Sequence, residues 1–234
     1  MTIEAGVPLR AVLFDAGNTL LFLDYARMAE AVSAVVGLPL TSAGLAAGEQ
    51  AAARSMELPR GSDRERATAY LEALFLAAGV PSGRLGDVRD TLAGLHGDRH
   101  LWSGVAEDTH EALARLRAAG LRLGVVSNSD GRVEEALEAA GLRPYFDVVV
   151  DSALAGIEKP DPAIFRAALD VLGVPPSQAL YVGDLYDVDV VGANAAGIPA
   201  VLLLAPGAAA PPGCAAVGSL GALADDLLKE RLAS

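Results

Sequence analysis

Five short apolar segments recur along the chain, separated by longer segments in which apolar and polar residues alternate with a helical period. The apolar segments lie at residues 11–15, 121–127, 147–150, 179–183 and 198–204. Short apolar runs bounded by turn residues are typical of strands that are buried on both faces of a parallel sheet. Helical patterns alternate with them at about 107–119, 132–140, 163–172 and 189–196. This alternation predicts an α/β fold with a doubly wound, Rossmann-like parallel sheet.

The tripeptide Ala-Ala-Gly occurs four times, each time after a helix-like segment and before an apolar residue. Its glycines are Gly79, Gly120, Gly141 and Gly197. Glycine adopts the left-handed backbone conformation that closes many helices without the steric cost that a Cβ atom brings. We therefore predict that each of these glycines caps the C-terminus of a helix.

Residues 21–103 interrupt the alternation, because they contain helical patterns and no convincing strand. Two apolar stripes recur there with a period of about 3.6 residues, and we expect both to face a local core. They consist of Tyr25, Met28, Ala29, Val32, Val35 and Val36, and of Ala67, Tyr70, Leu71, Leu74, Phe75 and Ala78. The sequence thus predicts a core domain of residues 1–20 and 104–234, with residues 21–103 inserted as a helical cap domain.

Charge and composition exclude several classes of partner. The formal net charge is −12, whereas nucleic-acid binding draws most of its strength from basic side chains that neutralise phosphates, so we expect no nucleic-acid partner. The longest apolar stretch, near 198–210, is too short to cross a bilayer, and the N-terminus lacks the long apolar region of a secretory signal. We therefore expect no membrane partner and a cytoplasmic location. The single cysteine, Cys214, cannot form an internal disulfide.

The first apolar segment ends in a carboxylate. Asp15 closes the segment 11–15, which places it at the C-terminal edge of the predicted sheet, where ligands bind in such folds. A carboxylate there can attack phosphorus or bind a metal ion. Aspartate also commonly stabilises the turn that follows a strand, and this segment alone does not distinguish the two roles.

Two more polar residues lie beside predicted elements, one at the end of a strand and one just before a helix. Ser127 ends the segment 121–127 and precedes Asn128, and its hydroxyl could donate a hydrogen bond to a phosphate oxygen. Lys159 lies just before the predicted helix and carries a compact positive charge suited to a phosphoryl group or a carboxylate. The chain has 18 basic residues but only two lysines, Lys159 and Lys229, which makes a merely solvated role for Lys159 less attractive.

Acidic residues are concentrated after the segment 179–183. Asp184, Asp187 and Asp189 follow Gly183 directly, and carboxylates this close repel one another unless a cation lies among them. A hard divalent ion with oxygen ligands, best Mg²⁺, fits this set. For Asp187 we favour capping of the next helix, where a carboxylate meets the positive end of the helix dipole.

Taken together and in this order, the four segments resemble the motifs of the haloacid dehalogenase superfamily. The resemblance implies an Mg²⁺-dependent phosphohydrolase in which Asp15 attacks a small phosphomonoester and becomes an aspartyl phosphate. The implied site consists of Ser127, Asn128 and Lys159 for substrate binding, Asp15, Gly17 and Asp184 for the metal ion, and Asp189 as a support of the metal site. It also implies that residues 21–103 form a helical cap of the family's first cap class, hinged at 20–24 and 101–104. We expect a monomer or homodimer whose partner is a small phosphorylated metabolite.

One position departs from the family pattern. Family phosphatases place a second aspartate two residues after the nucleophile, to protonate the leaving alcohol and then activate water, and Gly17 stands there. The Gly17 carbonyl can ligate Mg²⁺ but cannot carry a proton. General acid–base catalysis is commonly worth about 10²–10⁴-fold, so we expect a slow phosphatase that favours good leaving groups. Asp24, His96 or His100 could substitute for the missing acid.

Two other activities fit the same residues. A 2-haloacid dehalogenase also lacks the second aspartate, but it needs no metal and typically replaces the Gly-Asp pair that is intact at Gly183 and Asp184. A degenerate phosphatase that binds phosphate or a protein partner without turnover is the other alternative. The retained Asp15 and Lys159 argue against it, since a scaffold does not need them. The Schiff-base chemistry of phosphonoacetaldehyde hydrolase is excluded, because residues 21–103 contain no lysine.

Overall fold

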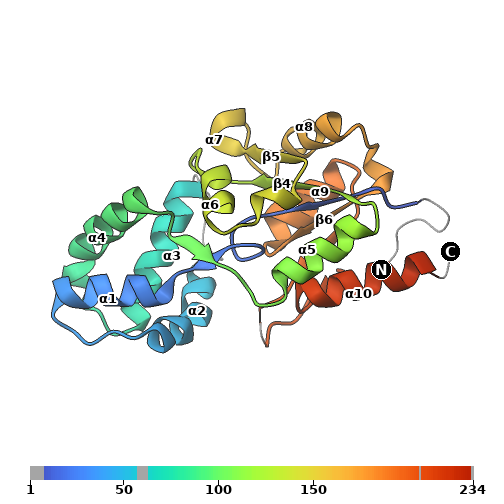
Figure 1. Cartoon of the computed structure of the whole chain (residues 1–234). Helices are drawn as coiled ribbons and strands as arrows, with labels where there is room; N and C mark the ends of the chain where they lie inside the picture. The colour runs from blue at the N-terminus through green and yellow to red at the C-terminus, as the bar shows by residue number, and fades with distance from the viewer. Residues whose placement is uncertain (1–7, 57–62, 206, 233–234) are drawn as a thin grey trace. The chain divides into compact units, whose positions relative to one another are not determined.

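The computed structural model describes residues 8–56, 63–205 and 207–232 (Figure 1). The chain forms two compact units, one that runs up to Phe22 and resumes at Gly104, and one that spans Leu23–Ser103. The sequence divided the chain at residues 20 and 104, and the action of the second unit as a cap stays a prediction. No helix among the described residues is both long and apolar enough to span a bilayer.

A parallel sheet forms the centre of the first unit. Within the described residues its strands are β1 (Ala11–Phe14), β4 (Arg122–Ser127), β5 (Val148–Asp151), β6 (Ala179–Gly183), β7 (Ala200–Leu203) and β8 (Ala216–Val217). They are ordered β5-β4-β1-β6-β7-β8, and each adjacent pair is parallel. The sequence predicted the first five of these strands. It missed β8, because two residues carry no measurable periodicity.

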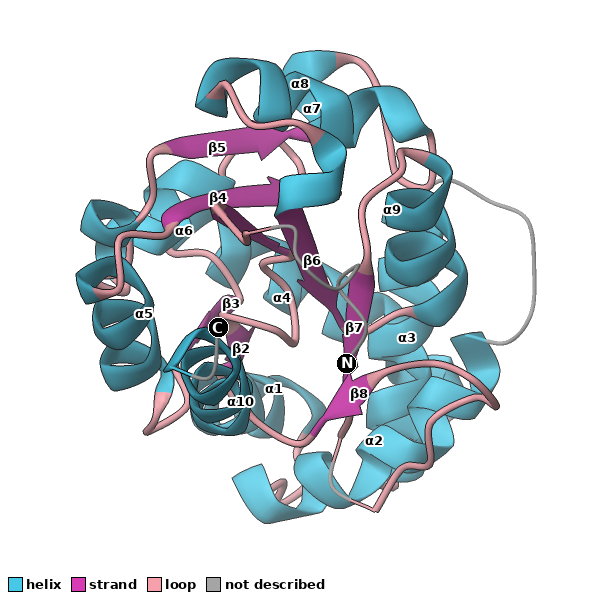
Figure 2. Ribbon diagram, turned by 90° about the vertical axis from the view of Figure 1, so that its right-hand side faces the viewer, coloured by secondary structure: helices cyan, strands magenta, loops and turns pink. Residues whose placement is uncertain are grey.

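Helices cover both faces of this sheet. They are α5 (Thr109–Ala118), α6 (Val133–Ala139), α7 (Ser152–Ala155), α8 (Pro162–Leu172), α9 (Val191–Ala195) and α10 (Leu220–Leu232). Figure 2 shows α5 and α10 on one face, and α8 and α9 on the other. On the second face, Phe165 and Ala193 pack against Leu13 and Tyr181 of the sheet in one buried cluster. The predicted doubly wound α/β fold is confirmed.

The four predicted glycine caps are also confirmed. Each glycine follows the last residue of α3, α5, α6 or α9 by two positions and has a positive φ. The φ angles are 91° at Gly79, 80° at Gly120, 70° at Gly141 and 83° at Gly197. A side chain with a Cβ atom would be strained there, so the repeated tripeptide marks where each helix must stop.

The segment after β6 differs from its prediction. We expected a helix at 189–196, whereas the chain forms a π-helical turn at Tyr186–Val190 that leads into α9. The turn begins without any side-chain cap, and Asp187 is exposed within it. The predicted capping role of Asp187 is therefore wrong. Asp189, inside the turn, accepts a hydrogen bond from the residue just before it, with Leu185 N 2.9 Å from Asp189 Oδ2.

The second unit is mainly helical. Its helices are α1 (Tyr25–Val36), α2 (Ser42–Met56), α3 (Asp63–Ala77) and α4 (Leu85–Asp98), with a 3₁₀ turn at Ser82–Arg84. The expectation of no strand in 21–103 is wrong at the ends of the insert. There β2 (Phe22–Leu23) and β3 (Trp102–Gly104) form a two-stranded sheet. Strands of two or three residues are too short to show an alternating pattern.

Both predicted apolar stripes contribute to the core of this unit. Met28, Val32, Leu74 and Phe75 are fully buried within it. Val35 is the exception, because 47% of its surface is exposed. It lies about 100° around the helix from its neighbour Val36, at the edge of the stripe, where helical periodicity no longer distinguishes buried from exposed positions.

Candidate active site

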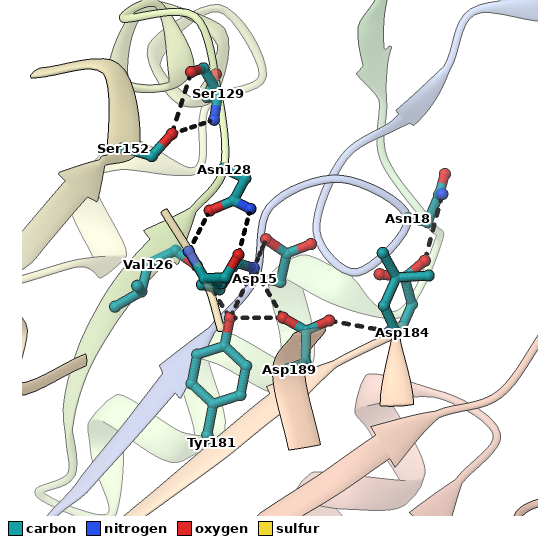
Figure 3. A network of polar contacts seen from close by, with 11 residues as sticks. Asp15, Asn18, Val126, Asn128, Ser129, Ser152, Tyr181, Asp184 and Asp189 are labelled. Carbon is teal, nitrogen blue, oxygen red and sulfur yellow. Dashed lines mark hydrogen bonds and ion pairs between the residues drawn. The ribbon is translucent and has the colours of Figure 1, made fainter. Parts of the chain in front are cut away.

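The predicted site residues of the first unit lie at one edge of its sheet. Asp15 follows β1, Ser127 is the last residue of β4, and Asp184 follows β6. Lys159 lies in the loop before α8. Parallel strands end on the same side, so residues far apart in sequence gather there (Figure 3).

Lys159 contacts two of the carboxylates at this edge of the sheet. Its side chain is almost completely buried, and its Nζ lies 2.6 Å from Asp15 Oδ1 and 2.7 Å from Asp189 Oδ1. Burial disfavours the charged ammonium, but the attraction of the two carboxylates outweighs it and raises the Lys159 pKa above its ordinary value. Lys159 therefore stays protonated as a fixed positive charge.

The Asp15 carboxyl group is buried, and its ion-pair partner is Lys159. Burial raises its pKa from 3.8 to about 6, although the Lys159 ammonium opposes this shift. The negative charge of Asp189 adds to the increase. Because its pKa is about 6, an additional positive charge nearby would lower the pKa and leave the Asp15 carboxyl group fully ionised at neutral pH.

Asp184 completes a cluster of carboxylates. Among the described residues, Asp15, Asp184 and Asp189 each offer an oxygen, and these oxygens lie within 4.8 Å of one another. Loss of water around the Asp184 carboxyl raises its pKa well above the ordinary value, and repulsion from Asp189 and Asp15 adds to this shift. Asn18 Nδ2 donates to Asp184 Oδ2 at 3.4 Å, a weak contact that orients the carboxylate.

Gly183 has a steric reason to be glycine. A Cβ atom built there would lie 2.4 Å from the Asp189 carboxylate carbon, far inside van der Waals contact. The Asp189 side chain packs over the backbone of Gly183 and is 1% exposed. From this position it reaches Lys159 on one side and Leu185 N on the other. The glycine of the Gly-Asp pair thus leaves room for the Asp189 side chain.

Asn128 holds the backbone of Lys159. Its Oδ1 accepts from Lys159 N at 2.8 Å, and its Nδ2 donates to Lys159 O at 3.1 Å. These bonds make it a support for the lysine, and its predicted contact with substrate stays a prediction.

Ser127 is 3% exposed, and its hydroxyl forms no hydrogen bond with another described residue. It is thus a donor that a ligand could use.

The loop after Asp15 folds tightly. The carbonyl of Ala16 accepts hydrogen bonds from Leu20 N at 2.9 Å and Leu21 N at 2.8 Å. Asn18 has a φ of 52°, in the left-handed region, which asparagine tolerates better than most residues other than glycine. In the part of the chain that the structure describes, no hydrogen bond uses the Gly17 carbonyl. That oxygen is therefore available to a ligand.

The donor set fits a hard divalent cation. Around Asp15 the described residues supply three clustered carboxylates, and the cationic side chain that pairs with them is Lys159. Negative charge is therefore in excess, and Asp184 forms no ion pair with any described residue. Oxygen donors from Asp15, Asp184 and the Gly17 carbonyl are the ligand type that Mg²⁺ prefers.

The three residues considered as substitute acids belong to the second unit, and each has a local partner. Asp24 accepts from Arg27 N at the start of α1 and pairs with Arg99 at 2.9 Å. His96 Nδ1 accepts from Leu101 N at 3.3 Å, and His100 Nδ1 lies 3.3 Å from Trp102 O. A role for any of them in proton transfer stays a prediction.

Sequence reasoning missed two residues of this network. Tyr181, inside β6, was counted only as an apolar strand residue, yet its hydroxyl lies 3.0 Å from Lys159 Nζ. Asn18 was passed over within the loop after Asp15. A tyrosine two residues before a Gly-Asp pair at a strand end is a signal that could have directed attention to its hydroxyl.

The chain is similar to known hydrolases. The family model of haloacid dehalogenase-like hydrolases matches residues 9–197. Haloacid dehalogenase-like hydrolase domain-containing protein 3 of Bos taurus is 44% identical over 102 residues, which cover 44% of this chain and 41% of that protein. Phosphoglycolate phosphatase of Rhodospirillum rubrum is 48% identical over 114 residues, or 48% of this chain and 44% of that enzyme. Each match spans less than half of the relative's own length.

Solved structures extend the likeness over nearly the whole chain. A HAD phosphatase from Thermococcus onnurineus superposes with a TM-score of 0.60 and 25% identity, covering 94% of this chain and 98% of that one. The matched family segment contains β1, β4, β5 and β6 together with the carboxylate and lysine cluster at their ends. This chain belongs to the haloacid dehalogenase-like hydrolase family.

Proposed function

We propose that this chain is an Mg²⁺-dependent phosphohydrolase that acts on a small phosphomonoester through an aspartyl phosphate on Asp15. The observation that carries the proposal is the contact of 2.6 Å between Asp15 and the buried Lys159, inside a cluster of carboxylates. The phosphatases among its relatives support the same reaction class.

Each side chain has a distinct part in this reaction. Lys159 engages Oδ1 of Asp15, so Oδ2 is the oxygen that would attack phosphorus. The new P–O bond forms as the bond to the leaving oxygen breaks, and the leaving group departs with the electron pair. Ser127 would hold a phosphoryl oxygen by a hydrogen bond, and Lys159 would attract the phosphoryl group by its charge. Water then attacks phosphorus, which releases phosphate and regenerates Asp15.

The metal ion would be held by Asp15, Asp184 and the Gly17 carbonyl, with Asp189 in support. When bound, Mg²⁺ supplies positive charge that offsets the charge of the phosphoryl group and keeps the neighbouring carboxylates ionised. Asp189 is committed to Lys159 and Leu185. Its part is to fix the lysine and the turn that follows Asp184.

Gly17 sets the expected substrate range. Without a carboxylate there, the leaving oxygen must take its proton from water, so aryl and acyl phosphates should react faster than alkyl phosphates. The loss corresponds to about 10²–10⁴-fold for the step that needs the acid. We therefore propose a slow enzyme with strong selectivity for good leaving groups.

Release of inorganic phosphate from alkyl, aryl and acyl phosphates, with Mg²⁺ and with EDTA, tests the proposal. We expect Mg²⁺-dependent release that disappears in Asp15→Asn, because an amide cannot act as this nucleophile. Arg10→Gln, at the surface near the start of β1, serves as the control and should retain full activity. Equal phosphate release by the wild type and Asp15→Asn would remove Asp15 from the mechanism.

Dehalogenation is the second candidate, and Gly17 is the observation that favours it. A dehalogenase would attack the carbon of a 2-halo acid with the same Asp15 carboxylate and would need no metal. Asp184 weighs against this chemistry, because a reaction without a metal ion does not need a third carboxyl group clustered with Asp15 and Asp189. Chloride release from a 2-chloro acid in EDTA, without phosphate release in Mg²⁺, would establish the dehalogenase instead.

A further inference from the structure

Tyr181 is a buried polar residue that the proposed reaction does not yet use. It lies in β6, and none of its surface is exposed. Its ring packs edge-on against Phe165, with centroids 4.9 Å apart. The ring therefore belongs to the core, while the hydroxyl extends to the edge of the sheet where the site lies (Figure 3).

The Tyr181 hydroxyl contacts three groups of the site. Lys159 Nζ lies at 3.0 Å, the Val126 carbonyl at 2.9 Å and Asp189 Oδ1 at 3.1 Å. A phenol has one proton, so the hydroxyl accepts from the lysine and donates to Val126 or Asp189. Burial and the nearby negative charges raise its pKa well above the ordinary value, which keeps that proton in place.

These contacts complete the surroundings of the Lys159 ammonium. The group has three N–H donors, and within the described residues it has three acceptors, Asp15 Oδ1, Asp189 Oδ1 and the Tyr181 hydroxyl. The first two acceptors are carboxylates, one from the residue that follows β1 and one from the turn after β6. The third ties it to Val126, the neighbour of Ser127 on β4.

We propose that Tyr181 is a positioning residue, whose hydroxyl fixes the Lys159 ammonium at the point where it meets a phosphoryl group. The proposal rests on the function assigned above, since it concerns how the phosphoryl-binding lysine is held. Without the hydroxyl, one N–H of a buried ammonium loses its acceptor, and the ammonium tilts toward the two carboxylates. The distance between the lysine and the Ser127 side of the site is then no longer fixed.

Tyr181→Phe isolates the hydroxyl, because phenylalanine keeps the ring against Phe165. Tyr145→Phe is the matched control, since the Tyr145 hydroxyl lies in the same unit and contacts His110 at 3.4 Å, away from the site. Thermal unfolding of both variants checks that each is folded. The two variants then differ in which hydroxyl is missing.

The first readout needs neither metal nor substrate. Because the chain contains only two lysines, selective ¹⁵N labelling of lysine gives two ammonium signals, and Lys159→Arg identifies one of them. We expect Tyr181→Phe to shift the Lys159 signal and speed its proton exchange, whereas Tyr145→Phe leaves both unchanged. A Lys159 signal that is the same in Tyr181→Phe and in the wild type would overturn the proposal.

The second readout separates this proposal from the proposed function. Inorganic phosphate with Mg²⁺ should perturb the Lys159 signal of the wild type, and its dissociation constant should rise about tenfold in Tyr181→Phe, the size expected for one hydrogen bond to a charged group. The kcat/KM for an aryl phosphate should fall by a similar factor. An unchanged dissociation constant would overturn the positioning role. If phosphate leaves the wild-type signal unmoved while Tyr181→Phe still shifts it, the assigned function of Lys159 fails and the contact itself stands.

Discussion

Asn128 and Lys159 are joined by two hydrogen bonds between one side chain and one backbone, of 2.8 Å and 3.1 Å. The lysine is therefore held at both ends, by Asn128 at its backbone and by carboxylates at its ammonium. The contact with Asn128 fixes the backbone of the loop before α8, and the contacts of the ammonium fix the end of the side chain.

Asn128→Ala removes both bonds and leaves two polar backbone groups of Lys159 without their partners. We expect the free energy of unfolding to fall by about 1–3 kcal/mol and phosphate release to fall with it. Asn194→Ala, at an exposed position of α9, is the control for the substitution itself. Chemical denaturation and phosphate release measure the two effects, and wild-type behaviour of Asn128→Ala would show that the loop is held by other contacts.

Gly183→Ala introduces a Cβ atom 2.4 Å from the Asp189 carboxylate carbon. Asp189 is buried and bonded on both sides, so it cannot move without releasing Lys159 or Leu185. We expect loss of most activity and roughly 1–3 kcal/mol of stability, typical of overpacking.

Gly218→Ala is the matched control for that variant, because a Cβ atom there would meet no other atom within 4 Å. It should behave as the wild type in both assays. Activity retained by Gly183→Ala would mean that Asp189 is not needed in its observed place.

Binding of Mg²⁺ should depend on pH in a direction set by the carboxyl groups. The pKa of Asp15 is raised to about 6 and that of Asp184 is raised well above its ordinary value, so the metal-free site holds protons that the cation must displace. The apparent dissociation constant for Mg²⁺ should fall as pH increases through 6, by about tenfold per pH unit for each proton released. Calorimetry in buffers of different ionisation enthalpy counts these protons.

The same shift affects stability without metal. Between about pH 4 and pH 6 the folded chain holds a proton on Asp15 that the unfolded chain has lost, so the free energy of unfolding falls as pH rises through this window. Mg²⁺ should restore stability most at the upper end of the window. Binding of Mg²⁺ that is independent of pH from 5 to 7 would contradict this account.

Gly17→Asp tests whether the missing proton carrier alone makes the enzyme slow. The new carboxylic acid can protonate an alkoxide leaving group, so hydrolysis of alkyl phosphates should accelerate far more than that of aryl or acyl phosphates. The measurement is kcat/KM for a matched alkyl and aryl pair. Gly17→Asn, which adds similar bulk without an acid, is the control, and equal rates in both variants would point to another acid or to different chemistry.

Local patterns predicted much of this molecule. The strands β1, β4, β5, β6 and β7 and the four glycine caps are visible in the sequence, because burial on both faces and positive φ each restrict residue type at a single position. The gathering of Asp15, Ser127 and Asp184 at one edge of the sheet follows from the rule that parallel strands end on one side, whereas the contact of Lys159 with Asp15 comes from a loop before a helix and was not predicted. What the sequence could not show is where side chains reach across the sheet.

Tyr181 illustrates that limit. Its ring satisfies the apolar pattern of β6, and nothing nearby in sequence shows that its hydroxyl meets Val126 and Lys159, which come from other elements. Asp187 and Asp189 are similarly indistinguishable by residue type. The π-helical turn, which exposes one and buries the other, decides between them.

The central place of β1 affects how the chain is made. Ala11 pairs with Arg122 on one side and Ala179 on the other. The lysine that contacts Asp15 lies 144 positions later in the chain. During synthesis on the ribosome, this apolar strand emerges before the entire helical unit and has no partner until β4 follows. A nascent chain that stops earlier exposes a hydrophobic strand with open edges, the kind of segment that aggregates or engages chaperones. We therefore expect fragments that end before residue 122 to be insoluble, and folding of the first unit to be completed only after most of the chain has left the ribosome.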